Sequence, residues 1–169
     1  MKRVVALAAG MMVVASMAAA AQPLMVQGVR EIGVSGMMDD NGEHLGLSLN
    51  GRYGSFVVDG IEAGVYGGVA LRGSGDRNTS LGLFSEYNFD LGGPLVPHIG
   101  IGLGLGWSDI GIKHDSYIEL EAWGGAKYFF IDYAAFGADV GVLYATEDIY
   151  NGYDDPIDWV LRLNTRWFF

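Results

Sequence analysis

Eight segments of the sequence show hydrophobicity with a period of two residues, and one face of each segment carries no charge along its central length. This period of two predicts β-strands, because successive side chains of a strand point to opposite faces of its sheet. Short runs of Gly, Asp, Asn and Pro between the segments predict turns and loops. The predicted strands span residues 28–38, 44–57, 61–72, 79–90, 96–107, 116–130, 133–146 and 157–169.

The charged residues of these segments gather on the face opposite to the uncharged one. A soluble sandwich or a lipocalin-like barrel would bury large interdigitating side chains on its apolar face. Here that face includes Ala122, Gly124 and Ala126 in succession, which favours an apolar face turned toward lipid and a charged face turned inward. We therefore predict an all-β fold, an eight-stranded antiparallel up-and-down transmembrane β-barrel. The predicted interior polar network consists of Glu31, Arg52, Glu62, Glu86, Glu119, Glu121, Lys127, Asp139, Arg162 and Arg166.

The expected lumen is narrow, because eight strands enclose little more than the space their inward side chains fill. Charges held away from water need partners of opposite sign, so we expect the acidic and basic residues to pair across the lumen, with His98 low in the barrel. This arrangement predicts a packed polar interior with a structural role. The alternative is that the same residues line a narrow, porin-like channel for small solutes.

Glycine occupies every second position from Gly100 to Gly106, within the stretch HIGIGLGLGW. The dinucleotide-binding fingerprint also needs a glycine five residues after the first, and Leu105 and Trp107 stand at those positions. We interpret the stripe as the lumen face of one strand, where the absent side chains make room for bulky neighbours and allow the strand to coil. The expected neighbours are Phe84, Glu86, Glu119, Glu121 and Trp123.

Aromatic residues predict two girdles where lipid meets water. Trp107, Tyr144 and Trp159 fall at one end of their strands, and a second group falls at the other end: Tyr53, Tyr87, Phe89, Tyr128, Phe130, Trp167 and Phe169. The tight connections 58–60, 91–95 and 131–132 lie at the second end, whereas the longest connection, 147–156, lies at the first. Short turns face the periplasm in bacterial barrels, which orients the predicted strands.

The first residues predict export. Lys2 and Arg3 precede an apolar run that ends in small residues suited to signal peptidase, so we interpret residues 1–21 as a signal peptide and 22–169 as the barrel domain. The chain of 169 residues contains no cysteine, which excludes disulfides and lipid-modified cysteine. Its formal net charge of −10 argues against a nucleic-acid partner.

The chain ends in LRLNTRWFF, which resembles the C-terminal signal that bacterial outer membrane barrels present to their assembly machinery. The residues that match this signal are Leu161, Leu163, Trp167 and Phe169. With the strand pattern, the whole mature chain resembles the small eight-stranded outer membrane barrels of the OmpA and OmpX type. The resemblance implies a monomer in the outer membrane of a Gram-negative bacterium, in contact with outer membrane lipids and lipopolysaccharide, with a structural or surface-interaction role.

Catalytic, cofactor-binding and metal sites are not predicted, and we expect no enzymatic activity. A less favoured alternative is a hydrolase, because His114 and Ser116 resemble the His-x-Ser element of the lipid A deacylase family, with Asp148 as a candidate triad acid. Tyr117 stands where that family has an asparagine. The acidic loops 39–43 and 147–156 lack the ligand spacing of a calcium loop, so we interpret them as solvated surface.

Overall fold

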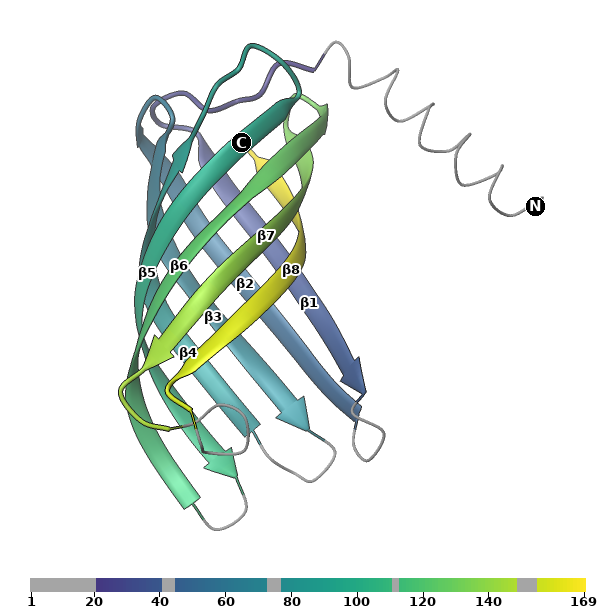
Figure 1. Cartoon of the computed structure of the whole chain (residues 1–169). Coiled ribbons are helices and arrows are strands. Elements are labelled where there is room, and N and C mark those ends of the chain that lie inside the picture. Colours follow the sequence, from purple (N-terminus) through teal and green to yellow (C-terminus); the bar gives the residue numbers. More distant parts are fainter. Residues whose placement is uncertain (1–20, 41–44, 73–76, 111–112, 149–154) are drawn as a thin grey trace, which may run out of the picture.

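A computed structural model describes residues 21–40, 45–72, 77–110, 113–148 and 155–169. Each strand pairs antiparallel with the next strand in the chain, and the last pairs with the first, so that the sheet closes into a barrel (Figure 1). The strands are β1 (Arg30–Asp40), β2 (Leu45–Val58), β3 (Ile61–Arg72), β4 (Arg77–Asn88), β5 (Leu95–Ile110), β6 (Lys113–Ile131), β7 (Ala134–Ala145) and β8 (Ile157–Phe168). The predicted eight-stranded antiparallel barrel is confirmed. No helix in the described ranges is long and apolar enough to cross a membrane.

Strands β5 and β6 continue beyond the predicted segments where the sequence loses its apolar face, whereas β7 and β8 are slightly shorter than predicted. β5 extends to Ile110 and β6 begins at Lys113, and the added residues pair with each other, for example Ser108 with Asp115. Backbone pairing needs no apolar side chains once a strand leaves the lipid. Hydrophobic alternation therefore marks the part of each strand that faces lipid rather than the full ladder.

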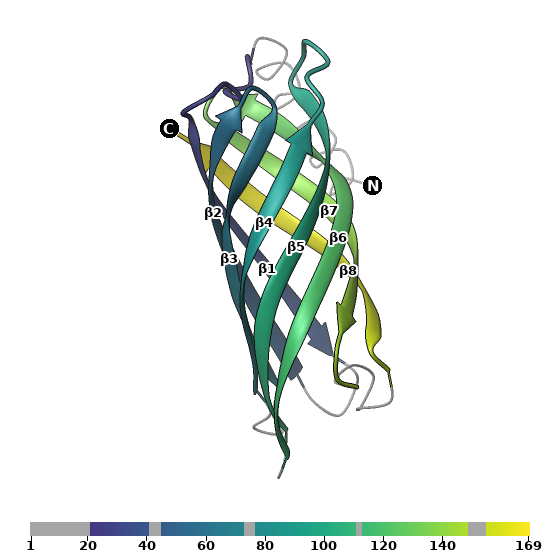
Figure 2. The same ribbon diagram turned by 90° about the vertical axis from the view of Figure 1, so that its left-hand side faces the viewer.

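The two ends of the barrel differ, as Figures 1 and 2 show. The connections β2–β3, β4–β5 and β6–β7 are short and lie at the upper end of both views, which we call the turn end; the opposite end is the loop end. Gly60 and Gly92 adopt positive φ angles of 75° and 73° in two of these turns, a conformation that glycine adopts without steric cost. Asp90 Oδ1 accepts a hydrogen bond from Gly92 N over 2.8 Å, which stabilises the second turn.

Side chains alternate between an exposed apolar outer face and a lumen face along every strand. The outer face carries the most exposed apolar residues of the barrel strands, among them Trp159 at 70% and Ile101 at 66%. Most of the expected girdle aromatics are also exposed there: Tyr53, Tyr87, Phe89, Trp107, Tyr144, Trp159, Trp167 and Phe169. Tyr128 and Phe130 are partly covered. An apolar exterior of this kind is suited to lipid.

The glycine stripe of β5 lies on the lumen face and makes room for aromatic rings, as predicted. A Cβ atom on Gly100 would collide with the Trp123 indole, and one on Gly106 would collide with the Tyr117 ring. Tyr66, which the sequence analysis did not place there, fills the space beside Gly104, where its hydroxyl would lie 2.6 Å from an added Cβ. The stripe is therefore a packing surface for three rings from β3 and β6.

Candidate functional site

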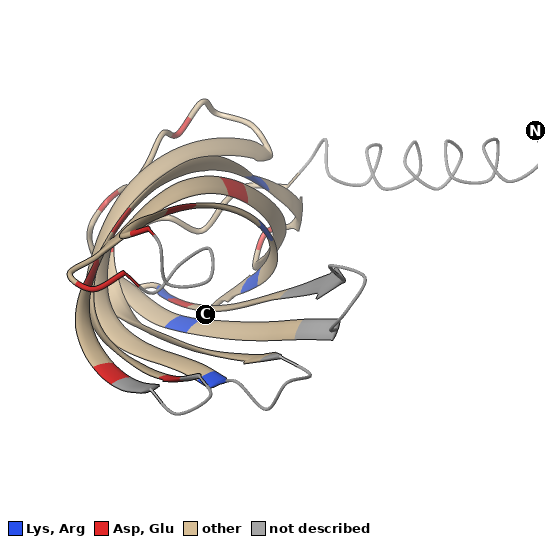
Figure 3. Ribbon diagram, turned by 60° about the horizontal axis from the view of Figure 1, so that its bottom comes forward, with Lys and Arg blue, Asp and Glu red and all other residues tan. Residues whose placement is uncertain are grey.

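The lumen holds the charged residues of the strands. Eight of the ten residues predicted for the interior network are buried, and Arg52 and Arg162 are partly buried. Charged positions occur on strands all around the wall in Figure 3, which views the barrel obliquely from the loop end. Each predicted residue has an inward parity on its strand, but the residues do not form one uniform network. They divide into a buried layer near the turn end and a more open chamber near the loop end.

The buried layer is organised around two cations, Lys127 and Arg166. Lys127 Nζ lies 2.8 Å from Glu31 Oε2 and 2.7 Å from Glu86 Oε1. Arg166 Nη1 lies 3.1 Å from Glu31 Oε1 and 2.9 Å from Glu86 Oε1. These four side chains are at most 1% exposed, so each charge depends on the others for compensation.

Glu86 is the most heavily bonded acid of this layer. Its Oε2 atom accepts hydrogen bonds from Arg52 Nη1 over 2.8 Å and from Trp123 Nε1 over 2.9 Å. The Arg52 guanidinium also lies over the Phe84 ring, 4.5 Å from its centroid. The sequence analysis placed Trp123 and Glu86 on either side of the glycine stripe but did not identify the indole as a hydrogen-bond donor to Glu86. The indole and Arg52 thus close the layer on its loop-end side.

Asp139 forms a second junction on the β7 side. Its Oδ1 atom lies 2.7 Å from His98 Nε2, and its Oδ2 atom accepts a hydrogen bond from Asn164 Nδ2 over 2.7 Å. Arg166 Nη2 lies 3.2 Å from the same Oδ2 atom, and Arg166 Nε donates to Asn164 Oδ1 over 2.8 Å. Asn164 was not predicted in the network, although it shares the inward parity of Arg162 and Arg166.

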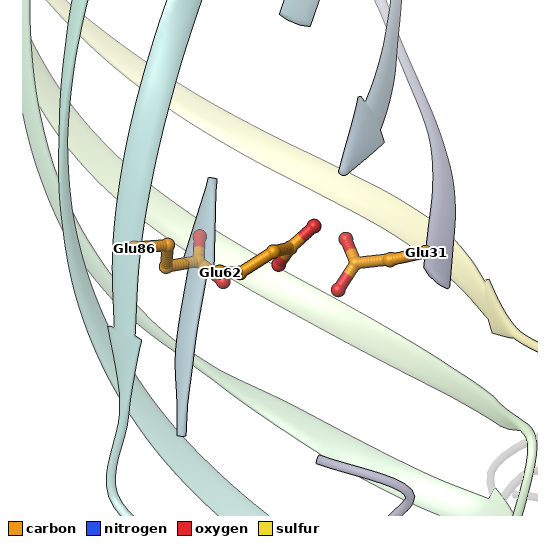
Figure 4. Close-up of side chains that lie close together, drawn as sticks. All are labelled: Glu31, Glu62 and Glu86. Carbon is orange, nitrogen blue, oxygen red and sulfur yellow. The ribbon is translucent and has the colours of Figure 1, made fainter. Parts of the chain in front are cut away.

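Glu62 differs from its neighbours. Figure 4 shows its carboxylate between those of Glu31 and Glu86, which come from separate strands. The three residues offer carboxylate oxygens within 4.8 Å of one another. Neither Glu62 oxygen accepts a hydrogen bond from any described residue, and Lys127 Nζ lies 3.8 Å from Glu62 Oε2. The Lys127 ammonium already lies against the other two carboxylates, so this acidic group has a resident cation supplied by the protein.

An apolar layer closes the lumen between the charged layer and the turn end. Phe129 packs against Phe168 with ring centroids 4.8 Å apart, and Phe56 packs against Phe168 at 6.4 Å. Val96 and Met25 belong to the same buried cluster. All five side chains are at most 5% exposed. This layer separates the charged residues from the turn end.

Met25 belongs to a segment before β1, residues 21–29, which we call the N-terminal strap. Gln22 N donates to Asp132 Oδ1 in the β6–β7 turn over 2.8 Å, and Gln27 N donates to Asp59 Oδ1 in the β2–β3 turn over the same distance. Gly60 N donates to the Met25 carbonyl over 2.9 Å. These two turns are four strands apart around the barrel, so the strap crosses the lumen at the turn end.

A polar cavity of about 180 Å³ occupies the lumen on the loop-end side of the charged layer. Arg162 pairs with Glu121 in its wall. Tyr117 donates a hydrogen bond to Asn78 Oδ1 over 2.6 Å in the same wall. The lumen is therefore filled by two side-chain layers toward the turn end and hollow toward the loop end.

The residues of the hydrolase alternative lie only partly within the described structure. Ser116 is exposed and pairs with Trp107, and Asp148 is exposed beyond the end of β7. The His114 side chain lies outside the described part of the chain, as do most residues of the acidic loops 39–43 and 147–156. The C-terminal residues Leu161, Leu163, Trp167 and Phe169 lie on the outer face, between 44% and 67% exposed.

Comparison with solved structures matches this barrel to outer membrane proteins. The N-terminal β-barrel domain of Pseudomonas aeruginosa OprF superimposes with a TM-score of 0.66 at 18% identity, over 85% of this chain and 98% of that one. Neisserial surface protein A gives a TM-score of 0.59 at 17% identity, over 83% and 96% of the two chains. The chain has the fold of the small eight-stranded outer membrane β-barrels.

The other comparisons support the fold of this protein but not its role. The outer membrane protein OprG of Pseudomonas aeruginosa matches with a TM-score of 0.57 at 12% identity, over 88% of this chain and 99% of that one. No protein-family model and no curated protein sequence match the chain. The outer membrane barrel fold hosts several unrelated activities, so the role of this protein has to be argued from its own lumen and surface.

Proposed function

We propose that this protein is a closed outer membrane barrel of a Gram-negative bacterium, which acts as a scaffold and presents its loops to the cell's surroundings. It is exported by a signal peptide, residues 1–21, and its turn end faces the periplasm. It has no enzymatic activity and no cofactor, works as a monomer, and contacts outer membrane lipids and lipopolysaccharide. The barrel assembly machinery recognises its last strand through Leu161, Leu163, Trp167 and Phe169.

The observation that carries the proposal is the double closure of the lumen. The layer of Lys127, Arg166 and their acidic partners is buried, and the aromatic layer with Met25 lies between it and the turn end. Ions crossing the barrel would have to displace paired charges and then pass an apolar layer. A scaffold needs no such path, whereas a channel does.

Single-channel recording tests this proposal. Residues 22–169 refolded into a planar bilayer should give no steady conductance, with folding verified by the altered gel mobility of the unheated barrel. Gly102→Trp, which adds a ring to the lumen beside Tyr66 and Trp123, should be equally silent. Steady currents that Gly102→Trp abolishes would contradict the closed lumen and identify the narrow-channel alternative.

Two further measurements test the role of the surface. Deleting residues 147–156 should abolish binding of the protein to its surface partner while leaving the refolded barrel intact. Lipid A incubated with the refolded protein should keep all its acyl chains. Deacylation that is lost in His114→Ala and Ser116→Ala would instead support the hydrolase alternative.

A further inference from the structure

The seam between β1 and β8 is paired over only part of its length. Its ladder contains five residue pairs, from Glu31 with Phe168 to Ser35 with Asn164. The other seven ladders each contain at least eleven pairs. On their other edges, β1 stays paired with β2 as far as Asp40 and β8 stays paired with β7 as far as Ile157. Figure 1 shows the two strands together near the turn end and apart toward the loop end.

In the open part of the seam the backbone pairing stops, although the two strands could continue in the same register. In the five observed pairs the residue numbers sum to 199, for example 31 + 168 and 35 + 164. The same register would bring Gly36 opposite Leu163 and Asp40 opposite Trp159. Between these positions, the described residues of the two strands leave one edge of each strand unpaired. In a membrane, such backbone N–H and C=O groups need hydrogen-bond partners.

The polar cavity reaches this open seam. Its lining includes Ser35 of β1 and Arg162 and Asn164 of β8, which face the lumen. It also includes Val34, whose side chain lies on the outer face and is 41% exposed. Beside the seam, the outer face of β8 carries three highly exposed apolar residues: Trp159 at 70%, Leu161 at 62% and Leu163 at 67%. A polar chamber and an apolar surface therefore meet at one line of unpaired backbone.

We propose that the open half of the β1–β8 seam is a lateral binding site for a phospholipid. The head group lies in the cavity and bonds to the free backbone edges and to Ser35 and Asn164. The hydrocarbon chains stay outside against the apolar residues of β8. The cavity, about 180 Å³, has the volume of roughly six water molecules, which limits the site to a small head group.

The charges of the chamber indicate which head group fits. Arg162 is paired with Glu121, and Arg52 is paired with Glu86, so neither guanidinium is available to a strong anion without losing its partner. A zwitterionic head group, such as phosphoethanolamine, brings both signs of charge and disturbs neither pair. This site depends on the proposed position of the barrel in a membrane, but not on the closure of the lumen to ions.

Cysteine pairs test the geometry of the seam, because the native chain contains no cysteine. Val34→Cys/Thr165→Cys joins two residues that are paired across the seam, and Gly36→Cys/Leu163→Cys joins the next positions on the same face, where pairing has ended. A disulfide requires Cα atoms within about 7 Å. Mild oxidation in lipid nanodiscs should cross-link the first variant and leave the second reduced. Equal cross-linking of both would show a closed seam and overturn the proposal.

A phospholipid probe tests the occupant. Ser35→Cys and Ser80→Cys both place a thiol in the cavity, the first at the seam and the second on β4 across the lumen. In nanodiscs that contain phosphatidylethanolamine, a water-soluble maleimide should label Ser35→Cys at least about tenfold more slowly than in nanodiscs of the anionic lipid phosphatidylglycerol. Ser80→Cys should be labelled at the same rate in both lipids and serves as the matched control for access of the reagent to the cavity.

Each other result would overturn the site. If Ser35→Cys is labelled as fast as Ser80→Cys in both lipids, no head group occupies the seam. If phosphatidylethanolamine slows the labelling of both cysteines equally, the lipid blocks the cavity as a whole and not the seam. If Ser35→Cys is labelled slowly in both lipids, the site does not select a zwitterionic head group. All three results can be obtained from a barrel that conducts or from one that is silent, so the failure of this site is distinguishable from the failure of the proposed function.

Discussion

Glu62 and Glu86 are two buried acids of the same layer whose charges are compensated to different degrees. Glu86 accepts hydrogen bonds or ion pairs from Arg52, Trp123, Lys127 and Arg166. Glu62 receives no hydrogen bond from the described residues and lies near the carboxylate of Glu31. Burial of an acid is favourable only when its partners replace the water it has lost. The number of donors around each carboxylate therefore decides its contribution.

Glutamine substitutions separate these two residues. Glu86→Gln removes the negative charge that Lys127 and Arg166 share, and we expect it to lower the free energy of unfolding by about 3–5 kcal/mol. Glu62→Gln keeps the shape and removes a poorly compensated charge, so stability should stay the same or rise. Urea unfolding of the refolded barrel in lipid vesicles measures both. A loss from Glu62→Gln as large as that from Glu86→Gln would contradict the difference between the two acids.

The glycines of β5 leave room for the aromatic rings of neighbouring strands. Gly106→Ala would drive a methyl group into the Tyr117 ring. Overpacking of this kind costs about 1–3 kcal/mol, so we expect the midpoint of urea unfolding to fall. The matched control is Gly51→Ala on the outer face of β2, where the nearest atom to an added Cβ is 4.0 Å away. This control should unfold at the same or a slightly higher urea concentration, and an equal loss in both variants would attribute the effect to backbone preference instead.

The N-terminal strap is an element that the alternation of the sequence did not predict. Met25→Ala would empty a buried position between Phe56, Phe129 and Phe168, and should lower stability by about 2 kcal/mol or more. Leu24→Ala changes the adjacent residue, which is 36% exposed, and should alter stability by less than about 0.5 kcal/mol. Thermal unfolding followed by gel mobility compares the two. If both variants match the parent barrel, the strap does not hold the turn end closed.

How much of the molecule the sequence could predict varies with the element. The eight strands, their lumen face and the role of the glycine stripe follow from a period of two, because that period records which side of a strand faces lipid. Individual contacts such as Asn164 with Asp139 could not be predicted, since they depend on the stagger between strands that closes the barrel. The interruption of the β1–β8 ladder could not be predicted either, since the register of the observed pairs gives no reason for the pairing to stop.

At the scale of the whole molecule, the proposed function places two different requirements on the same outer face. Lipid requires only that the side chains are apolar, whereas assembly by a machinery requires particular residues at the end of the chain. Phe169 is 58% exposed, while its backbone N and O both pair with Arg30. Its ring therefore adds little to the packing of the folded barrel, although its backbone helps to close the seam.

Phe169→Ala should consequently separate assembly from stability. We expect the refolded variant to unfold within about 1 kcal/mol of the parent protein, because the backbone pairing is kept and a lipid-facing ring is lost. In cells, the amount of folded barrel in the outer membrane should fall severalfold, and unfolded chain should accumulate in the periplasm. Phe136→Ala, which removes an outward ring of similar exposure, 53%, from β7, should assemble normally. Equal assembly of the two variants would show that the Phe169 ring contacts lipid but is not needed for recognition by the assembly machinery.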